Sequence, residues 1–239
     1  MIQRSIIQYT PSLEAMCEQC AAASSALCSV FTAEHRLALE EIGHQVFLAR
    51  GELLCEQYAP ADRIYNLIEG MLTVERTTSC GQRQIVAFLF PGDFLGLSFS
   101  DEYDYTVRSL TAAKVCAFQR SPFLKVCEQF PTIKSRVSKI HDMILARVLD
   151  QLFTLGQKKA HERVSFLLIQ LLERQRGCKD NTLVLHTTRQ DIADYLGLTM
   201  ETVSRAFTRL RQDGLIDLPG SKKVVITDRE ALRILANNR

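Results

Sequence analysis

Apolar residues recur at three- and four-residue intervals near the C-terminal end of the chain, which predicts two short helices within residues 188–210. Thr188 and Asp191 form an approximate capping box at the start of the first helix, and Gly197 suits the left-handed backbone that ends it. Thr199 can cap the second helix. Two apolar runs separated by a Pro-Gly turn follow at residues 215–226, and they predict a two-stranded wing.

The second helix carries Glu201, Ser204 and Arg205 on one polar face, opposite its apolar stripe. A guanidinium can bond guanine O6 and N7, a carboxylate can accept from cytosine N4, and a hydroxyl can contact thymine. A solvated face on an ordinary helical hairpin is the alternative, and the adjoining wing favours a DNA-binding helix-turn-helix. The side chains expected to contact DNA are Glu201, Ser204, Arg205, Thr188, Arg189, Thr199, Thr202, Lys222 and Lys223.

Short β-forming runs separated by Gly and Pro fill residues 45–118, and they predict an antiparallel barrel or roll. A metal-dependent enzyme built on such a roll needs clustered histidines and a carboxylate. Here His44 stands alone in the roll, with His35 just before it. We therefore expect no enzyme. The sequence also contains no G-x-x-x-x-G-K-[ST] phosphate-binding loop.

An uninterrupted helical pattern covers residues 132–155, with apolar positions repeating over about three heptads. This seam favours pairing with a second copy over packing on the roll alone. A two-fold dimer places two recognition helices one DNA turn apart, which suits a palindromic site. The residues expected in the dimer seam are Ile133, Val137, Ile140, Ile144, Val148, Leu152 and Leu155.

Three cysteines lie close together near the N-terminus, at Cys17, Cys20 and Cys28. The C-x₂-C spacing lets two thiolates face one metal, and both zinc and an iron–sulfur cluster accept such ligands. A terminus that merely contains thiols is the alternative. No signal peptide or long apolar segment is present, so we expect a cytoplasmic protein without a disulfide framework or a membrane partner.

The balance of charged residues differs between the N-terminal and C-terminal halves of the chain. Residues 1–127 hold 10 Lys and Arg against 14 Asp and Glu, whereas residues 128–239 hold 19 against 13, which suits a polyanion at the C-terminal side. We predict an α+β protein with an N-terminal roll, a long dimerisation helix and a C-terminal winged helix-turn-helix. The expected domains are a cysteine segment at 1–30, the roll at 31–127, the helix at 128–156 and the DNA-binding domain at 157–239.

In this order of elements the chain resembles the CRP/FNR family of bacterial transcription regulators. Three motifs carry the resemblance: PGDFLG at 91–96, KKAHER at 158–163, and Glu201, Ser204 and Arg205, which match the E-x-x-S-R signature of the FNR branch. The resemblance implies a jelly roll of the cyclic-nucleotide-binding kind. It further implies TTGAT-like half-sites, in which Glu201 and Arg205 read the G·C pair and Ser204 a neighbouring T. RNA polymerase is then a further expected partner.

The FNR branch also implies a [4Fe–4S] cluster and a DNA-binding dimer that oxygen weakens. Its ligands here would be Cys17, Cys20, Cys28 and Cys116, with seven residues rather than five between the second and third ligands. The remaining cysteines, Cys55, Cys80, Cys127 and Cys178, are expected to be free thiols. Other inputs remain open as alternatives: structural zinc, redox thiols or a cyclic nucleotide.

Two positions depart from relatives within the family. The cyclic-AMP-binding members hold the phosphate with an Arg-Ser pair, where this chain has Tyr103 and Asp104, so cyclic nucleotide control is disfavoured. FNR has an acidic residue on its dimer helix that opposes pairing after cluster loss, and this chain has Val148 there. We therefore expect a dimer that oxygen disrupts less completely.

Overall fold

The computed structural model describes residues 28–97, 100–175 and 181–237. These residues form two compact units. The first holds residues 28–76 and 88–143, and the second holds residues 77–87 and 144–237. Cys17, Cys20 and Cys178 lie outside the described residues, so the structure does not address the predictions made for them.

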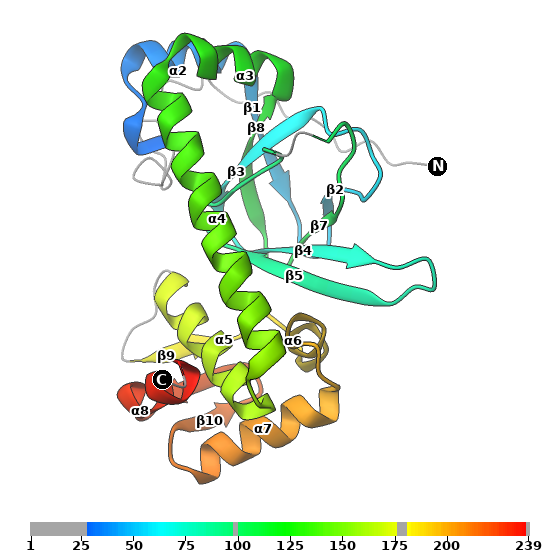
Figure 1. Ribbon diagram of the computed structural model, residues 1–239, viewed down its shortest axis with the longest axis vertical. Coiled ribbons are helices and arrows are strands. Elements are labelled where there is room, and N and C mark those ends of the chain that lie inside the picture. Colours follow the sequence, from blue (N-terminus) through cyan, green and yellow to red (C-terminus); the bar gives the residue numbers. More distant parts are fainter. Residues whose placement is uncertain (1–27, 98–99, 176–180, 238–239) are drawn as a thin grey trace. The chain divides into compact units, whose positions relative to one another are not determined.

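Two four-stranded antiparallel sheets make the predicted β-roll (Figure 1). The roll is confirmed, but the short strands β2 and β6 were not predicted because two or three residues show no periodicity. The first sheet has the order β1 (Gly43–Leu48), β8 (Ala113–Gln119), β3 (Arg63–Glu69) and β6 (Phe94–Leu95). The second has the order β2 (Leu53–Cys55), β7 (Thr106–Ser109), β4 (Leu72–Thr77) and β5 (Arg83–Leu89).

Helices cover one face of the first sheet and complete the core of the first unit. They are the 3-10 turn η1 (Cys28–Val30), α2 (Ala33–Glu40), α3 (Arg120–Gln129) and the N-terminal half of α4 (Pro131–Gln157). Their apolar side chains pack with those of β3 and β8 in one cluster, where Ile64, Phe118, Phe123 and Ile133 are almost completely buried. The packing fixes which sheet residues face the helices.

The second unit contains the predicted winged helix-turn-helix. Helix α5 (Ala160–Arg174) precedes the helix pair α6 (Arg189–Leu196) and α7 (Met200–Gln212), and α8 (Arg229–Asn237) follows the wing. The wing strands β10 (Ile216–Gly220) and β11 (Lys223–Ile226) pair antiparallel, and β9 (Thr182–Val184) adds a third strand beside β11. Core side chains from α5, α6 and α7 include Leu167, Ile192 and Phe207.

The long helix α4 does not present one continuous seam. Ile133 and Ile140 are buried in the core of the first unit, and Val137 packs against that core. Ile133 and Ile140 therefore pack in the core of the roll and not in a seam open to a second copy, so the seam prediction was wrong for these two residues. Val137 is only partly buried, and its place in a seam stays a prediction.

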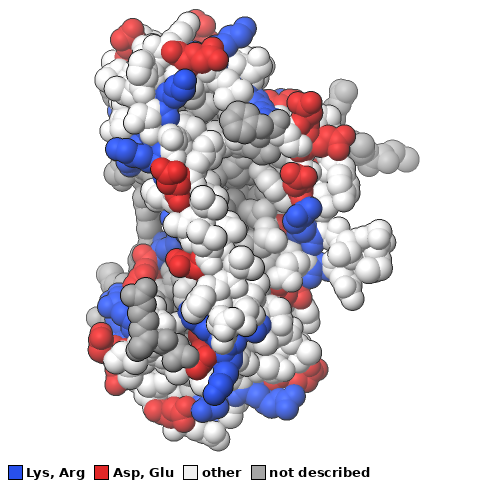
Figure 2. Space-filling model, in the orientation of Figure 1, with Lys and Arg blue, Asp and Glu red and all other residues white. Residues whose placement is uncertain are grey.

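Farther along α4 the apolar side chains are exposed. Val148 and Leu152 are 56% and 66% exposed, and Ile144 of the prediction is also exposed. Figure 2 shows largely uncharged surface where this half of α4 runs in Figure 1. We call these exposed apolar residues of α4 the exposed stripe: Met143, Ile144, Leu145, Val148, Leu149, Leu152 and Phe153.

Within the described part of the chain, no helix combines the length and apolarity that crossing a membrane requires.

Candidate DNA-binding interface and cysteine site

Helix α6 begins and ends with the capping groups that the sequence predicts. The Thr188 hydroxyl accepts from the Asp191 amide at 3.0 Å, and the Asp191 carboxylate accepts from the Thr188 amide at 2.8 Å. Gly197 takes the left-handed backbone at φ 61°, a conformation that costs other residues more. Thr199 caps α7 by accepting from the Thr202 amide at 3.2 Å. Both helices are thus fixed at the turn between them.

Helix α7 carries the base-reading candidates on its exposed face. Glu201, Ser204 and Arg205 are all exposed, whereas Val203 and Phe207 on the opposite face are buried. A backbone hydrogen bond at the helix N-terminus, joined by one from Thr199, lowers the pKa of Glu201, so this group is a carboxylate acceptor at neutral pH. Figure 2 shows Lys and Arg side chains gathered near α7. The wing candidates Lys222 and Lys223 are exposed at the β10–β11 turn.

Arg189 has a structural role that the sequence did not reveal. Its guanidinium carbon lies 3.4 Å from the centre of the Phe207 ring, which stacks the first residue of α6 on the core of α7. Burial lowers the pKa of Arg189. Its Nη1 atom is buried without a hydrogen-bond partner among the described residues. Arg189 therefore joins the two helices of the motif, in addition to its predicted place at the DNA surface.

The C-terminal carbonyls of α6 are held by side chains from two other helices. Arg163 donates from Nη1 to the Leu196 carbonyl at 2.9 Å and from Nη2 to the Leu155 carbonyl at 2.7 Å. Gln151 donates to the Tyr195 carbonyl at 3.0 Å. Arg163 belongs to the KKAHER motif. Its structural role is to connect the C-terminal ends of α4 and α6 through these two hydrogen bonds.

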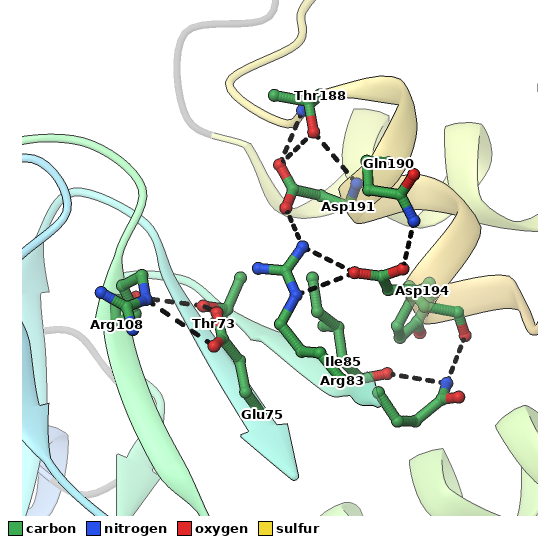
Figure 3. A network of polar contacts seen from close by, with 11 residues as sticks. Thr73, Glu75, Arg83, Ile85, Arg108, Thr188, Gln190, Asp191 and Asp194 are labelled. Carbon is green, nitrogen blue, oxygen red and sulfur yellow. Dashed lines mark hydrogen bonds and ion pairs between the residues drawn. The ribbon is translucent and has the colours of Figure 1, made fainter. Parts of the chain in front are cut away.

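A residue far away in the sequence binds two aspartates of α6. Arg83, the first residue of β5, contacts the carboxylates of both Asp191 and Asp194 (Figure 3). Sequence reasoning missed Arg83, because no local pattern connects a β-hairpin residue with a helix 108 positions later. The described residues 77–87 around it belong to the same compact unit as α6.

The cysteine site lies on the helix-covered face of the first sheet. Antiparallel register places Gln45 of β1, Cys116 of β8 and Asn66 of β3 side by side, and we call these three residues the polar row. All three are buried, with 6%, 6% and 1% exposure. Asn66 donates from Nδ2 to the Cys28 sulfur at 3.1 Å. The structure therefore brings together Cys28 and Cys116, two of the predicted ligands, around Asn66.

Two orphaned amide oxygens mark the polar row. Gln45 Oε1 and Asn66 Oδ1 are buried and have no hydrogen-bond partner within the part of the chain that the structure describes. An unpaired acceptor in a protein interior costs free energy, so each one in a native fold requires an explanation. Within the described residues no group of three potential metal ligands occurs.

The remaining described cysteines have other surroundings. Burial raises the pKa of Cys55 to about 12 and that of Cys127 to about 11, so both remain protonated thiols at neutral pH. Cys80 is exposed, and hydrogen bonds led by that from Thr78 lower its pKa. A thiolate is the form that binds metal. These features agree with free thiols at Cys55 and Cys127, and they make Cys80 the most reactive of the three.

Tyrosines fill the part of the roll where a cyclic nucleotide phosphate would need a cation. Tyr103, at the position of the family arginine, is buried and donates its hydroxyl to the Arg63 carbonyl at 2.9 Å. Its ring lies 5.9 Å from that of Tyr105. Burial raises the pKa of Tyr105 to about 12, so this side chain is uncharged at neutral pH. The neighbouring Asp104 is exposed and adds negative charge.

The fold and the interface together define a winged helix-turn-helix protein with a regulatory β-roll. The model of the Crp-like helix-turn-helix domain matches residues 162–235, and that of the cyclic nucleotide-binding domain matches residues 45–130. The nitrogen fixation regulation protein FixK of Bradyrhizobium diazoefficiens is 36% identical over 84% of this chain and 85% of its own length. The transcriptional activator protein FnrL of Cereibacter sphaeroides is 30% identical over 91% of this chain and 90% of its own.

Among solved structures, FixK2 from Bradyrhizobium japonicum matches with a TM-score of 0.76 and 28% identity, covering 81% of this chain and 97% of that one. The chain belongs to the CRP/FNR family of transcription regulators. The resemblance read from its motifs is thus confirmed. DNA binding through α6 and α7 follows from the family and from the helix-turn-helix that the structure shows.

Proposed function

We propose that the protein is an oxygen-responsive transcription regulator whose input is a [4Fe–4S] cluster held by Cys17, Cys20, Cys28 and Cys116. The observation that carries the proposal is that Cys28 and Cys116 are both neighbours of Asn66, at the buried polar row. Cys28 begins the described part of the chain, and its contact with Asn66 joins it to β3 of the roll.

The described residues fit such a group. Thiolates buried in an apolar core need hydrogen-bond donors, and Asn66 already donates to the Cys28 sulfur. The Gln45 side chain lies on the other side of Cys116 and can offer its amide in the same way. The apolar neighbours Phe94 and Phe118 of the same core limit access of water. When bound, the cluster supplies a redox-active centre that reacts with oxygen.

The output would be a homodimer on a palindromic site. The exposed stripe on α4 is a contiguous run of large apolar side chains on one helix, and monomeric proteins rarely leave such a surface uncovered. A second copy of α4 covers it by the knobs-into-holes packing of a short coiled coil. We propose TTGAT-like half-sites, with Glu201 and Arg205 at the G·C pair and Ser204 beside a thymine, and contact with RNA polymerase at the promoter.

Other inputs are less well supported by the site. A cyclic nucleotide would need a guanidinium near Tyr103, whose hydroxyl is already bonded to the backbone. Redox control through a single thiol would point to exposed Cys80, which lies in the β4–β5 turn and not at the polar row. Structural zinc on the same four cysteines remains the direct competitor.

Anaerobic purification followed by metal and sulfide analysis tests the proposal. We expect about four iron and four sulfide per subunit and a brown protein that bleaches in air. A colourless protein with one zinc and no sulfide contradicts it. Cys116→Ser should abolish iron binding, and Cys127→Ser is the matched control, because both cysteines are buried in the same core. Equal iron in both variants would remove Cys116 from the site.

A further inference from the structure

Arg83 makes a two-carboxylate contact with the first helix of the DNA-binding motif. Its Nη2 lies 2.7 Å from Asp191 Oδ1 and 2.6 Å from Asp194 Oδ2, and its Nε donates to Asp194 Oδ2 at 2.8 Å. The Asp194 contact uses two guanidinium nitrogens, which gives it a defined geometry. The side chains of Asp191 and Asp194 are only 10% and 13% exposed, so solvent screens these ion pairs weakly.

The same two carboxylates have their other oxygens occupied by α6 itself. Asp191 Oδ2 accepts from the Thr188 amide and hydroxyl, at 2.8 and 2.7 Å, and closes the capping box. Asp194 Oδ1 accepts from Gln190 Nε2 at 2.6 Å. Arg83 therefore binds the remaining oxygen of each carboxylate and extends a hydrogen-bond network that already orders the first turn of α6 (Figure 3). Displacing Arg83 leaves both carboxylates with an uncompensated charge.

The position of these charges matters for binding a polyanion. Asp191 and Asp194 stand one turn apart on α6, and Thr188, which caps the start of this helix, is exposed. DNA carries one negative charge per about 1.7 Å of its axis. Two bare carboxylates on α6 would repel each other and the phosphates. Arg83 offsets part of this charge without itself belonging to residues 162–235, which match the helix-turn-helix model.

We propose that Arg83 is a positioning residue for DNA binding. It holds α6 through Asp191 and Asp194 and offsets their charge, so the helix-turn-helix reaches full affinity only when the hairpin residue is in place. The proposal concerns affinity for the DNA backbone and the order of α6, and it assigns no base contact to Arg83. It rests on the DNA-binding function of the family and does not depend on the metal of the cysteine site.

The test is DNA affinity of the full-length protein, measured by fluorescence anisotropy under one set of anaerobic buffer conditions. The probes are a duplex with two TTGAT-like half-sites and a duplex in which these half-sites are scrambled. Arg83→Met should raise the Kd for both duplexes by about three- to tenfold, and Arg83→Lys should recover part of the loss because it keeps the charge. Amide hydrogen exchange over 189–196 should accelerate in Arg83→Met.

Whether Arg83 acts through the two aspartates is tested by making the same substitution in a protein that lacks both carboxylates. With Asp191→Asn and Asp194→Asn present, Arg83→Met should change the Kd by less than about twofold, because its partners are already neutral. Arg76→Met, which removes an exposed cation from β4, is the matched control and should leave the Kd nearly unchanged.

An equal loss in both backgrounds, an equal loss in Arg76→Met, or no loss in Arg83→Met overturns the proposal. Wild-type protein that binds both duplexes equally contradicts the proposed half-site alone, and the comparison of Arg83 variants is then made on either duplex.

Discussion

Asn66 donates a hydrogen bond of 3.1 Å to the sulfur of Cys28, although the two residues are 38 positions apart in the sequence. Asn66 is also the cross-strand neighbour of Cys116. One buried amide therefore links the cysteine segment with the middle of the first sheet. Its remaining oxygen, like that of Gln45, has no hydrogen-bond partner among the described residues.

Substitution of Asn66 by Leu should weaken the cysteine site while the fold is retained. The change removes the donor to Cys28, and loss of such an outer partner typically costs about 10- to 100-fold in metal affinity. We expect anaerobic iron release to a chelator to be at least about tenfold faster. Ile68→Leu, on the same face of the same strand, is the control. Identical release rates for the wild type and both variants would show that Asn66 does not support the site.

Substitution of Arg205 by Ala should remove discrimination at one base pair. An exposed guanidinium on the recognition helix that bonds guanine twice contributes about 1–3 kcal/mol of specificity. We expect the preference for G over other bases at the third position of TTGAT to disappear in a competition assay. Arg209→Ala removes an exposed arginine of the same helix and should weaken all sequences alike. Retained preference in Arg205→Ala contradicts the assignment.

Substitution of Leu152 by Glu should convert the dimer into a monomer. The side chain is 66% exposed on the exposed stripe of α4, and two glutamates facing each other across a two-fold axis repel. Sedimentation velocity should show the mass of one chain, 27.1 kDa. Leu37→Glu, at another exposed leucine, should leave the dimer intact. A dimer in the Leu152 variant would place the interface elsewhere.

Sedimentation velocity also tests the role of Val148. It lies on the exposed stripe, where an apolar side chain favours pairing. We expect wild-type protein to sediment as a dimer in air as well as without oxygen, and Val148→Asp to dissociate in air. Complete dissociation of the wild type in air would contradict the role given to Val148.

Acid should weaken the α6 network through Asp191. Burial opposes ionisation of Asp191, but hydrogen bonds from Thr188 and the contact with Arg83 outweigh it and lower the pKa of the folded state. A lowered folded pKa means that the stabilisation is fully present above the unfolded pKa of about 3.9 and is lost as the pH falls through the folded pKa. We expect the wild type to exceed Asp191→Asn by about 1–2 kcal/mol near neutrality.

That advantage should shrink when the pH falls below about 4. Thermal unfolding of both proteins across this range measures it. A difference between wild type and Asp191→Asn that is independent of pH would show that the charge of Asp191 contributes nothing.

Local chemistry in the sequence determined the helix-turn-helix, the wing and the roll. Thr188, Gly197 and Thr199 each act within four residues of themselves, so capping and the left-handed turn are legible before any tertiary contact is known. The polar face of α7 and the alternation of the roll strands are likewise local periodicities. Together with the motifs at 91–96, 158–163 and 201–205, they were sufficient to identify the family.

Only the tertiary structure shows which surface or partner the residues of each sequence pattern contact. Ile133 and Leu152 belong to one apolar repeat, yet the first is buried in the core of the roll and the second is exposed, because burial depends on which surface a helix face meets. The polar row depends on strand register, which a sequence does not display when strands are far apart along the chain. The contact of Arg83 with Asp191 depends on folding that brings together residues 108 positions apart, and no local energy term encodes it.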